Sequence, residues 1–189
     1  CVILFAAVVA IVAASLYGSK IKLNYIEQIH LQDGYLYCVD RGKGDDLKII
    51  RSNPDGGEGD MIVCKRHVRE QYRMVRQIFF DGEGEVYALV EETNVEAWDG
   101  ASCKVYKCDF KHGKLRETSY DLTEEAQKYG QIEVARIQDG DLYYIRIPDV
   151  EKGSAKAELM ALTLQGELRT LDKVKLKYPY LNAQFFLSE

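Results

Sequence analysis

The sequence is poor in residues and motifs that carry chemistry. It holds three histidines, His30, His67 and His112, and no two of them have the four-residue spacing by which a helix brings two ligands to one zinc ion. No serine lies in a G-x-S-x-G motif, which excludes the nucleophile elbow of the α/β-hydrolases. The net charge is −5 and the basic residues form no stripe, so nucleic acid is not an expected partner. We therefore expect no catalytic residues, no metal and no cofactor.

Proline and clear helix patterns are also scarce. The chain has three prolines and thirteen tyrosines, and its Val, Ile and Leu occur in short runs, a composition that favours strands. With 47% hydrophobic and 29% charged residues it is an ordinary globular chain, which excludes intrinsic disorder. After residue 19, helix is predicted only in two connectors. Residues 123–130 begin with a Thr cap and acidic residues and end at Gly, and residues 67–74 are a weaker candidate.

Charge is absent from residues 1–19, which are almost wholly apolar. A run of this length is at the short end of what spans a bilayer and is long for the hydrophobic region of a signal peptide, and both interpretations imply export. We favour an uncleaved transmembrane signal anchor, because the run ends at the interfacial aromatic Tyr17, shortly before Lys20. Cleavage before Ser15 and a buried core helix are the alternatives. The expected location is the cell membrane, with the rest of the chain on the extracytoplasmic side.

One sequence frame recurs three times. Gly34, Gly84 and Gly140 lie 50 and 56 residues apart, and each follows an acidic residue. Each is followed by an aliphatic residue at the second position, Tyr at the third and another aliphatic residue at the fifth. Strand-rich units with such a period are typical of β-propeller blades. The chain therefore predicts an all-β fold of three four-stranded antiparallel meanders. The predicted strands are residues 26–32, 35–39, 47–51 and 61–63, then 75–80, 86–91, 104–110 and 115–122, then 134–138, 142–147, 159–164 and 168–171.

The domain division follows from the repeats. Residues 184–189 are similar to residues 28–33 and predict the start of a fourth blade. We divide the chain into a transmembrane helix and a partial propeller. Because propellers close with about four to eight blades, this interpretation makes the chain the N-terminal part of a longer protein. An open stack or a three-bladed domain is the alternative. The bounds are 1–19 for the helix and 20–189 for the propeller, with blades at about 25–68, 73–122 and 133–176 and the next beginning at 178–189.

Four cysteines, Cys38, Cys64, Cys103 and Cys108, follow the apolar run. In an exported domain they allow two disulfides, and the sequence does not separate the three pairings. Cys38 takes the repeat position of Ala88, so packing as small apolar side chains is the favoured interpretation.

Residues 47–58 join an apolar strand to an Asp-Gly-Gly turn at Asp55. This element resembles the strand and turn of exported bacterial β-propellers of the TolB type, and the repeats loosely resemble WD-repeat blades. The Trp-Asp signature of WD repeats is missing, because Trp98 and Asp99 precede a strand instead of ending one. The resemblance implies a propeller fold and an exported setting. It implies no activity, because propellers host unrelated functions.

The loop predicted at residues 92–102 is the candidate contact element. It is longer than most hairpin loops, and it holds the only tryptophan of the chain. We expect Trp98 to anchor a ligand or partner, with Asp99, Asn94 and Glu96 beside it. The alternative is that Trp98 folds back and covers the edge of the blade.

These observations predict a binding module and no enzyme. The expected function is that of a membrane-anchored extracytoplasmic β-propeller that recognises a small ligand or a protein, as the sensory part of a receptor. A propeller enzyme of the carbohydrate-active or lyase type, completed by further blades, is one alternative. A scaffold of envelope assembly is another, which the TolB-like turn suits.

Overall fold

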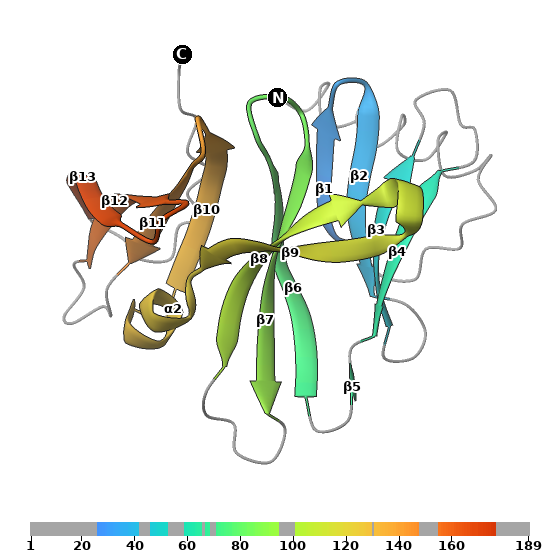
Figure 1. The fold of residues 1–189 in the computed structure, drawn as a ribbon, viewed down its shortest axis with the longest axis horizontal. Helices are drawn as coiled ribbons and strands as arrows, with labels where there is room; N and C mark the ends of the chain where they lie inside the picture. Colours follow the sequence, from blue (N-terminus) through green and yellow to red (C-terminus); the bar gives the residue numbers. More distant parts are fainter. Residues whose placement is uncertain are drawn as a thin grey trace. The chain divides into compact units, whose positions relative to one another are not determined.

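The structure, a computed structural model, describes residues 26–41, 46–52, 59–65, 67–68, 71–94, 101–129, 131–147 and 155–176. Within these ranges it is built almost entirely of strands, which form three antiparallel meanders (Figure 1). The predicted all-β fold of antiparallel meanders is therefore confirmed. Among the described residues no helix has the length and apolar character needed to cross a bilayer. The predicted anchor at residues 1–19 lies outside them.

Each sheet follows chain order. The first sheet pairs as β1-β2-β3-β4, the second as β5-β6-β7-β8-β9 and the third as β10-β11-β12-β13. The strands of the first sheet are β1 (Ile26–Gln32), β2 (Tyr35–Arg41), β3 (Asp46–Ser52) and β4 (Asp60–Lys65). Those of the second are β5 (His67–Val68), β6 (Gln71–Phe80), β7 (Val86–Asn94), β8 (Ser102–Asp109) and β9 (Lys114–Asp121). Those of the third are β10 (Gln131–Gln138), β11 (Asp141–Ile147), β12 (Ala155–Thr163) and β13 (Leu168–Leu176).

Of the two connector helices that the sequence predicts, the structure contains one. The helix α2 (Thr123–Tyr129) joins β9 to β10, as predicted. The helix predicted at residues 67–74 is wrong, because β5 and the start of β6 occupy it. Gln71 pairs with Asn94 and Tyr72 with Thr93, so the hydrogen bonds to β7 extend β6 into this segment. Pairing between strands overrides a weak local preference for helix.

The repeat frame is also a repeat of strand register. In each sheet the aliphatic residue two positions after the turn glycine pairs with a residue at or near the end of the preceding strand. These pairs are Leu36 with Leu31, Val86 with Phe80 and Leu142 with Ile137. The next residues, Tyr37, Tyr87 and Tyr143, therefore hold equivalent places in three sheets, as the frame predicts. Because strand side chains alternate, each Tyr faces away from the aliphatic residue before it.

The chain divides into two compact units. The first comprises residues 1–69 and 108–116, and the second comprises residues 70–107 and 117–189. In the first unit the 3-10 turn η1 (Phe110–His112) packs its buried Phe110 ring against Tyr37, with 6.0 Å between ring centroids. Asp109 caps this turn. Burial alone would raise the pKa of Asp109, but hydrogen bonds from Arg116 and His112 lower it to about 2.

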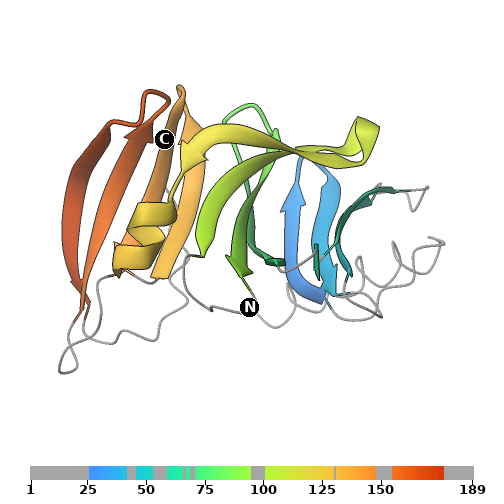
Figure 2. The same ribbon diagram turned by 60° about the horizontal axis from the view of Figure 1, so that its bottom comes forward.

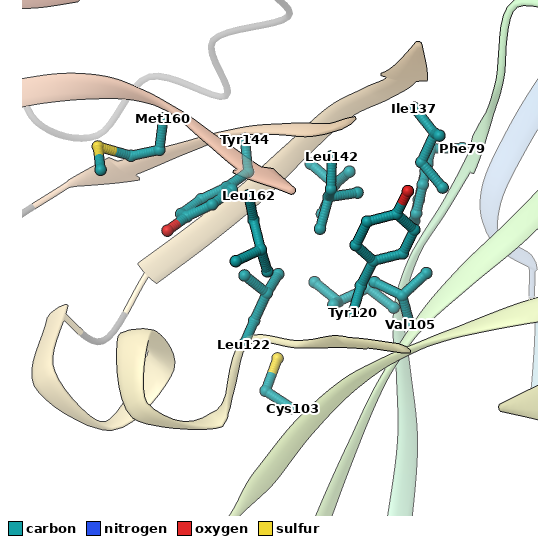
Figure 3. Close-up of a cluster of buried hydrophobic side chains, with 12 residues drawn as sticks. Phe79, Cys103, Val105, Tyr120, Leu122, Ile137, Leu142, Tyr144, Met160 and Leu162 are labelled. Carbon is teal, nitrogen blue, oxygen red and sulfur yellow. The ribbon is translucent and has the colours of Figure 1, made fainter. Parts of the chain in front are cut away.

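The core of the second unit lies between its two sheets (Figure 3). Its buried members are Phe79, Leu89, Cys103, Val105, Tyr120, Leu122, Val134, Ile137, Leu142, Tyr144, Met160 and Leu162. Along β11, Leu142 and Tyr144 face this core, while Ile145 and Ile147 belong to a second apolar cluster with Ala157. Alternation along the strand puts the two clusters on opposite sides. The third sheet is therefore apolar on both faces.

The helix α2 lies against the third sheet (Figure 2). Charged groups hold it there. Arg146, whose side chain is 10% exposed, donates from Nη1 to Glu125 of the helix at 2.6 Å and from Nε to Glu158 of β12 at 2.8 Å. The Tyr144 hydroxyl also donates to Glu125, at 2.8 Å. The guanidinium lies 4.0 Å from the centre of the Tyr129 ring. This network fixes the connector between the second and third sheets.

The four cysteines in the described part of the chain are buried and free of disulfides. Burial, reinforced by Asp40, raises the pKa of Cys38 to about 12, and burial with Glu91 raises that of Cys103 to about 12. These side chains pack as small apolar groups, as the repeat position of Cys38 indicates.

Candidate functional site

The second unit contains a pocket of about 890 Å³. Its walls come from the β6–β7 turn, the β10–β11 turn, the parts of β8 and β9 beside them and Leu164, which follows β12 (Ala155–Thr163). Pockets of about 300 to 1,000 Å³ are typical of small-ligand sites. The side chains that line it include the apolar or aromatic Phe80, Tyr87, Tyr120 and Leu164 and the charged Asp81, Glu83, Lys107, Arg136 and Asp139.

The two turns meet because β6 of the second sheet is joined to β10 of the third. The backbone of Asp81 forms a parallel bridge with Ile137. Further along, the amide of Gln77 donates to the Val134 carbonyl oxygen at 2.7 Å and accepts from the Val134 N–H at 2.8 Å. These contacts hold β6 beside β10, so both hairpin turns fall at one end of the two sheets.

The β10–β11 turn is a tight one. Asp139 has φ 52° and Gly140 has φ 80°, and positive φ at both central residues is the requirement of a type I′ hairpin turn. The Gly140 carbonyl oxygen accepts a 2.8 Å hydrogen bond from the hydroxyl of Tyr120 on β9. The second sheet thus fixes the position of this turn of the third.

The β6–β7 turn is longer and is organised by Asp81. Its Oδ1 accepts hydrogen bonds from the backbone N–H groups of Glu83 and Glu85, each at 2.9 Å. Its Oδ2 accepts from the Tyr87 hydroxyl at 3.2 Å. Burial and the Asp81 charge raise the pKa of Tyr87, so the phenol keeps its proton and remains a donor. Phe79 stacks on the Tyr87 ring at 5.8 Å. Asp81 and Tyr87 are therefore parts of a rigid wall.

The remaining charges of the pocket are not neutralised equally. Lys107 pairs with Glu85 at 3.1 Å. The Arg136 Nε is buried, and no hydrogen bond or ion pair joins the guanidinium to any residue that the structure describes. Among the same residues the carboxylates of Glu83 and Asp139, both exposed, have no partner either. The pocket thus presents one cation and two anions to a ligand.

No family model, curated protein or solved structure matches this chain. Across the described residues no group of three or more His, Cys, Asp or Glu side chains could hold a metal ion.

Three residues of the predicted contact loop, Glu96, Trp98 and Asp99, lie outside the residues that the structure describes. Asn94 is described, but it is the last residue of β7 instead of part of a loop, because it pairs with Gln71. The pocket lies at the other end of β7. At about 3.3 Å per residue, the strand puts Asn94 about 26 Å from the pocket end.

Only a weak sequence signal indicates the pocket. Acidic-Gly turns such as Asp139-Gly140 indicate hairpins, and equivalent turns of consecutive repeats fall at the same end of neighbouring sheets. Arg136, in contrast, lies on the polar face of a predicted strand and carries no signal by itself. Arg136 lines the pocket only because the second and third sheets pack together.

Proposed function

We propose that the chain is a run of β-propeller blades, of the kind that exported bacterial propellers contain, and that it acts as a binding module. Its meanders share one strand register, and the third sheet is apolar on both faces, as a blade between two neighbours must be. The parallel bridge between Asp81 and Ile137 fits inner strands that run in the same direction around an axis.

The observation that carries the binding function is the pocket formed by turns of consecutive sheets, with Arg136 unpaired in its wall. Its shape is fixed by hydrogen bonds of Asp81 and Tyr120, so a ligand meets a preformed surface. Preorganisation of this kind reduces the entropy that binding costs. Binding without reaction is favoured, since Asp81 is engaged by its own turn and Tyr87 keeps its proton.

In this proposal residues 1–19 anchor the module in the cell membrane, and the sheets lie on the extracytoplasmic side as a sensor. The support is the uncharged apolar run at these positions. Reporter fusions after Tyr178 test the topology. Activity of a reporter that works only in the cytoplasm contradicts it.

Binding is tested with the full chain and a fragment library, observed by saturation-transfer NMR. Leu164 lines the pocket and is 51% exposed, so Leu164→Trp narrows the pocket at small cost to the core. Val174→Trp is the matched control, because Val174 is 49% exposed and does not line the pocket. We expect fragments that bind the chain to be lost with Leu164→Trp and kept with Val174→Trp. Binding that is absent, or insensitive to Leu164→Trp, contradicts the proposed function.

A further inference from the structure

The unpaired charges of the pocket are of both signs. Arg136 supplies an unpaired guanidinium on β10, and Glu83 and Asp139 supply unpaired carboxylates on the two turns. A guanidinium presents a planar set of donors that matches a carboxylate, and a carboxylate accepts hydrogen bonds from an ammonium group. A ligand that satisfies both groups carries one negative and one positive end.

Other classes of ligand leave a charge unmatched. A dianion meets Arg136 but is repelled by Glu83 and Asp139, and a polyamine pairs with the carboxylates but leaves Arg136 without a partner. A neutral sugar neutralises none of the three. The zwitterion is the class whose charges complement all three groups, so it fits best.

The apolar lining and the volume of the pocket indicate the apolar part and the size of the ligand. Phe80, Tyr120 and Leu164 offer aromatic and aliphatic surface in the same pocket. At about 890 Å³ the pocket exceeds a single amino acid and holds a chain of a few residues. The side chains of such a ligand would cover the apolar wall.

We propose that this pocket binds short zwitterionic peptides, with the terminal carboxylate on Arg136 and the terminal ammonium on Glu83 and Asp139. This inference rests on the binding function proposed above and names its ligand class.

The test compares three probes that differ only at their ends: the tripeptide Ala-Leu-Ala, its C-terminal amide and its N-acetyl derivative. Calorimetric titration into the full chain gives the three affinities. Because each blocked form loses one charge-assisted interaction, we expect the free tripeptide to bind at least about tenfold more tightly than either of them. In Arg136→Gln the tripeptide and its amide should bind alike. In the double variant Glu83→Gln, Asp139→Asn the tripeptide and its acetyl derivative should bind alike.

Lys156→Gln is the control, since Lys156 is an exposed cation of β12 outside the pocket, and it should leave all three affinities unchanged. Equal binding of the free and blocked tripeptides by the unaltered chain overturns the inference, even if a variant fails to fold. Fragments that occupy the pocket while no peptide binds also overturn it and leave the binding function standing. If neither peptides nor fragments bind, both proposals fall.

Discussion

Gln77 offers a direct test of how consecutive sheets of the second unit are joined. β10 is the first strand of its sheet, so half of its backbone groups point away from β11 and need other partners. The Gln77 amide satisfies both the N–H and the C=O of Val134, at 2.8 and 2.7 Å. A register shift lies between Val75 and Gln77, and a bulge of this type redirects the side chains beside it.

Gln77→Leu removes both hydrogen bonds and leaves two backbone groups of Val134 without protein partners. Each unsatisfied buried group costs about 1 to 3 kcal/mol. Since the site is only partly buried, water recovers some of this, and we expect a loss of about 2 to 4 kcal/mol in the free energy of unfolding. Gln77→Glu keeps only the accepting half and places a carboxylate against the Val134 carbonyl oxygen, so it should be destabilising as well.

Urea unfolding followed by circular dichroism measures the effect. With a slope of about 2 kcal/mol per molar urea, the midpoint should fall by about 1 to 2 M in Gln77→Leu. The control is Gln127→Leu, because Gln127 makes a single exposed hydrogen bond, 3.2 Å to Ala101. A Gln77→Leu loss below about 0.5 kcal/mol, no larger than an ordinary surface substitution, refutes the idea that this amide joins the sheets.

Three further predictions concern the same unit. Leu142 is fully buried, so Leu142→Ala should lower the free energy of unfolding by about 2 to 5 kcal/mol in the same urea assay, and a loss under about 1 kcal/mol contradicts the core assignment. Hydrogen bonds from Lys173 and Arg146 lower the pKa of Glu158 below 4.5, so the ionised group stabilises the fold above that pH and the gain is lost as pH falls through the folded-state value. Glu158→Gln should therefore flatten the loss of stability seen on acidification, and an unchanged pH profile argues against the network. Cys103, with a pKa of about 12, should resist alkylation by iodoacetamide at mildly alkaline pH until urea unfolds the chain, and rapid labelling of the native protein contradicts its burial.

Local sequence patterns are sufficient to predict most of the strands. The turn glycines Gly34 and Gly140 fix the register of their hairpins, because positive φ is needed at their positions. The period-two pattern around Tyr37 or Tyr143 predicts which side chains lie on each face of the sheet. Residues 67–74 were predicted wrongly because pairing with β7 decides their structure. The unpaired state of Arg136 depends on contacts between two sheets, which no local pattern encodes.

The apolar character of both faces of the third sheet has a consequence for how such a chain can evolve. A sheet that offers Leu142 and Tyr144 on one face and Ile145 and Ile147 on the other is complementary to a copy of itself in sequence order. Tandem duplication of one repeat inserts a sheet whose faces already suit both neighbours, so repeat number can change without redesign of an existing core. Each new repeat also brings a new pair of turns, and so a further surface on which recognition can diverge while the older pocket is retained.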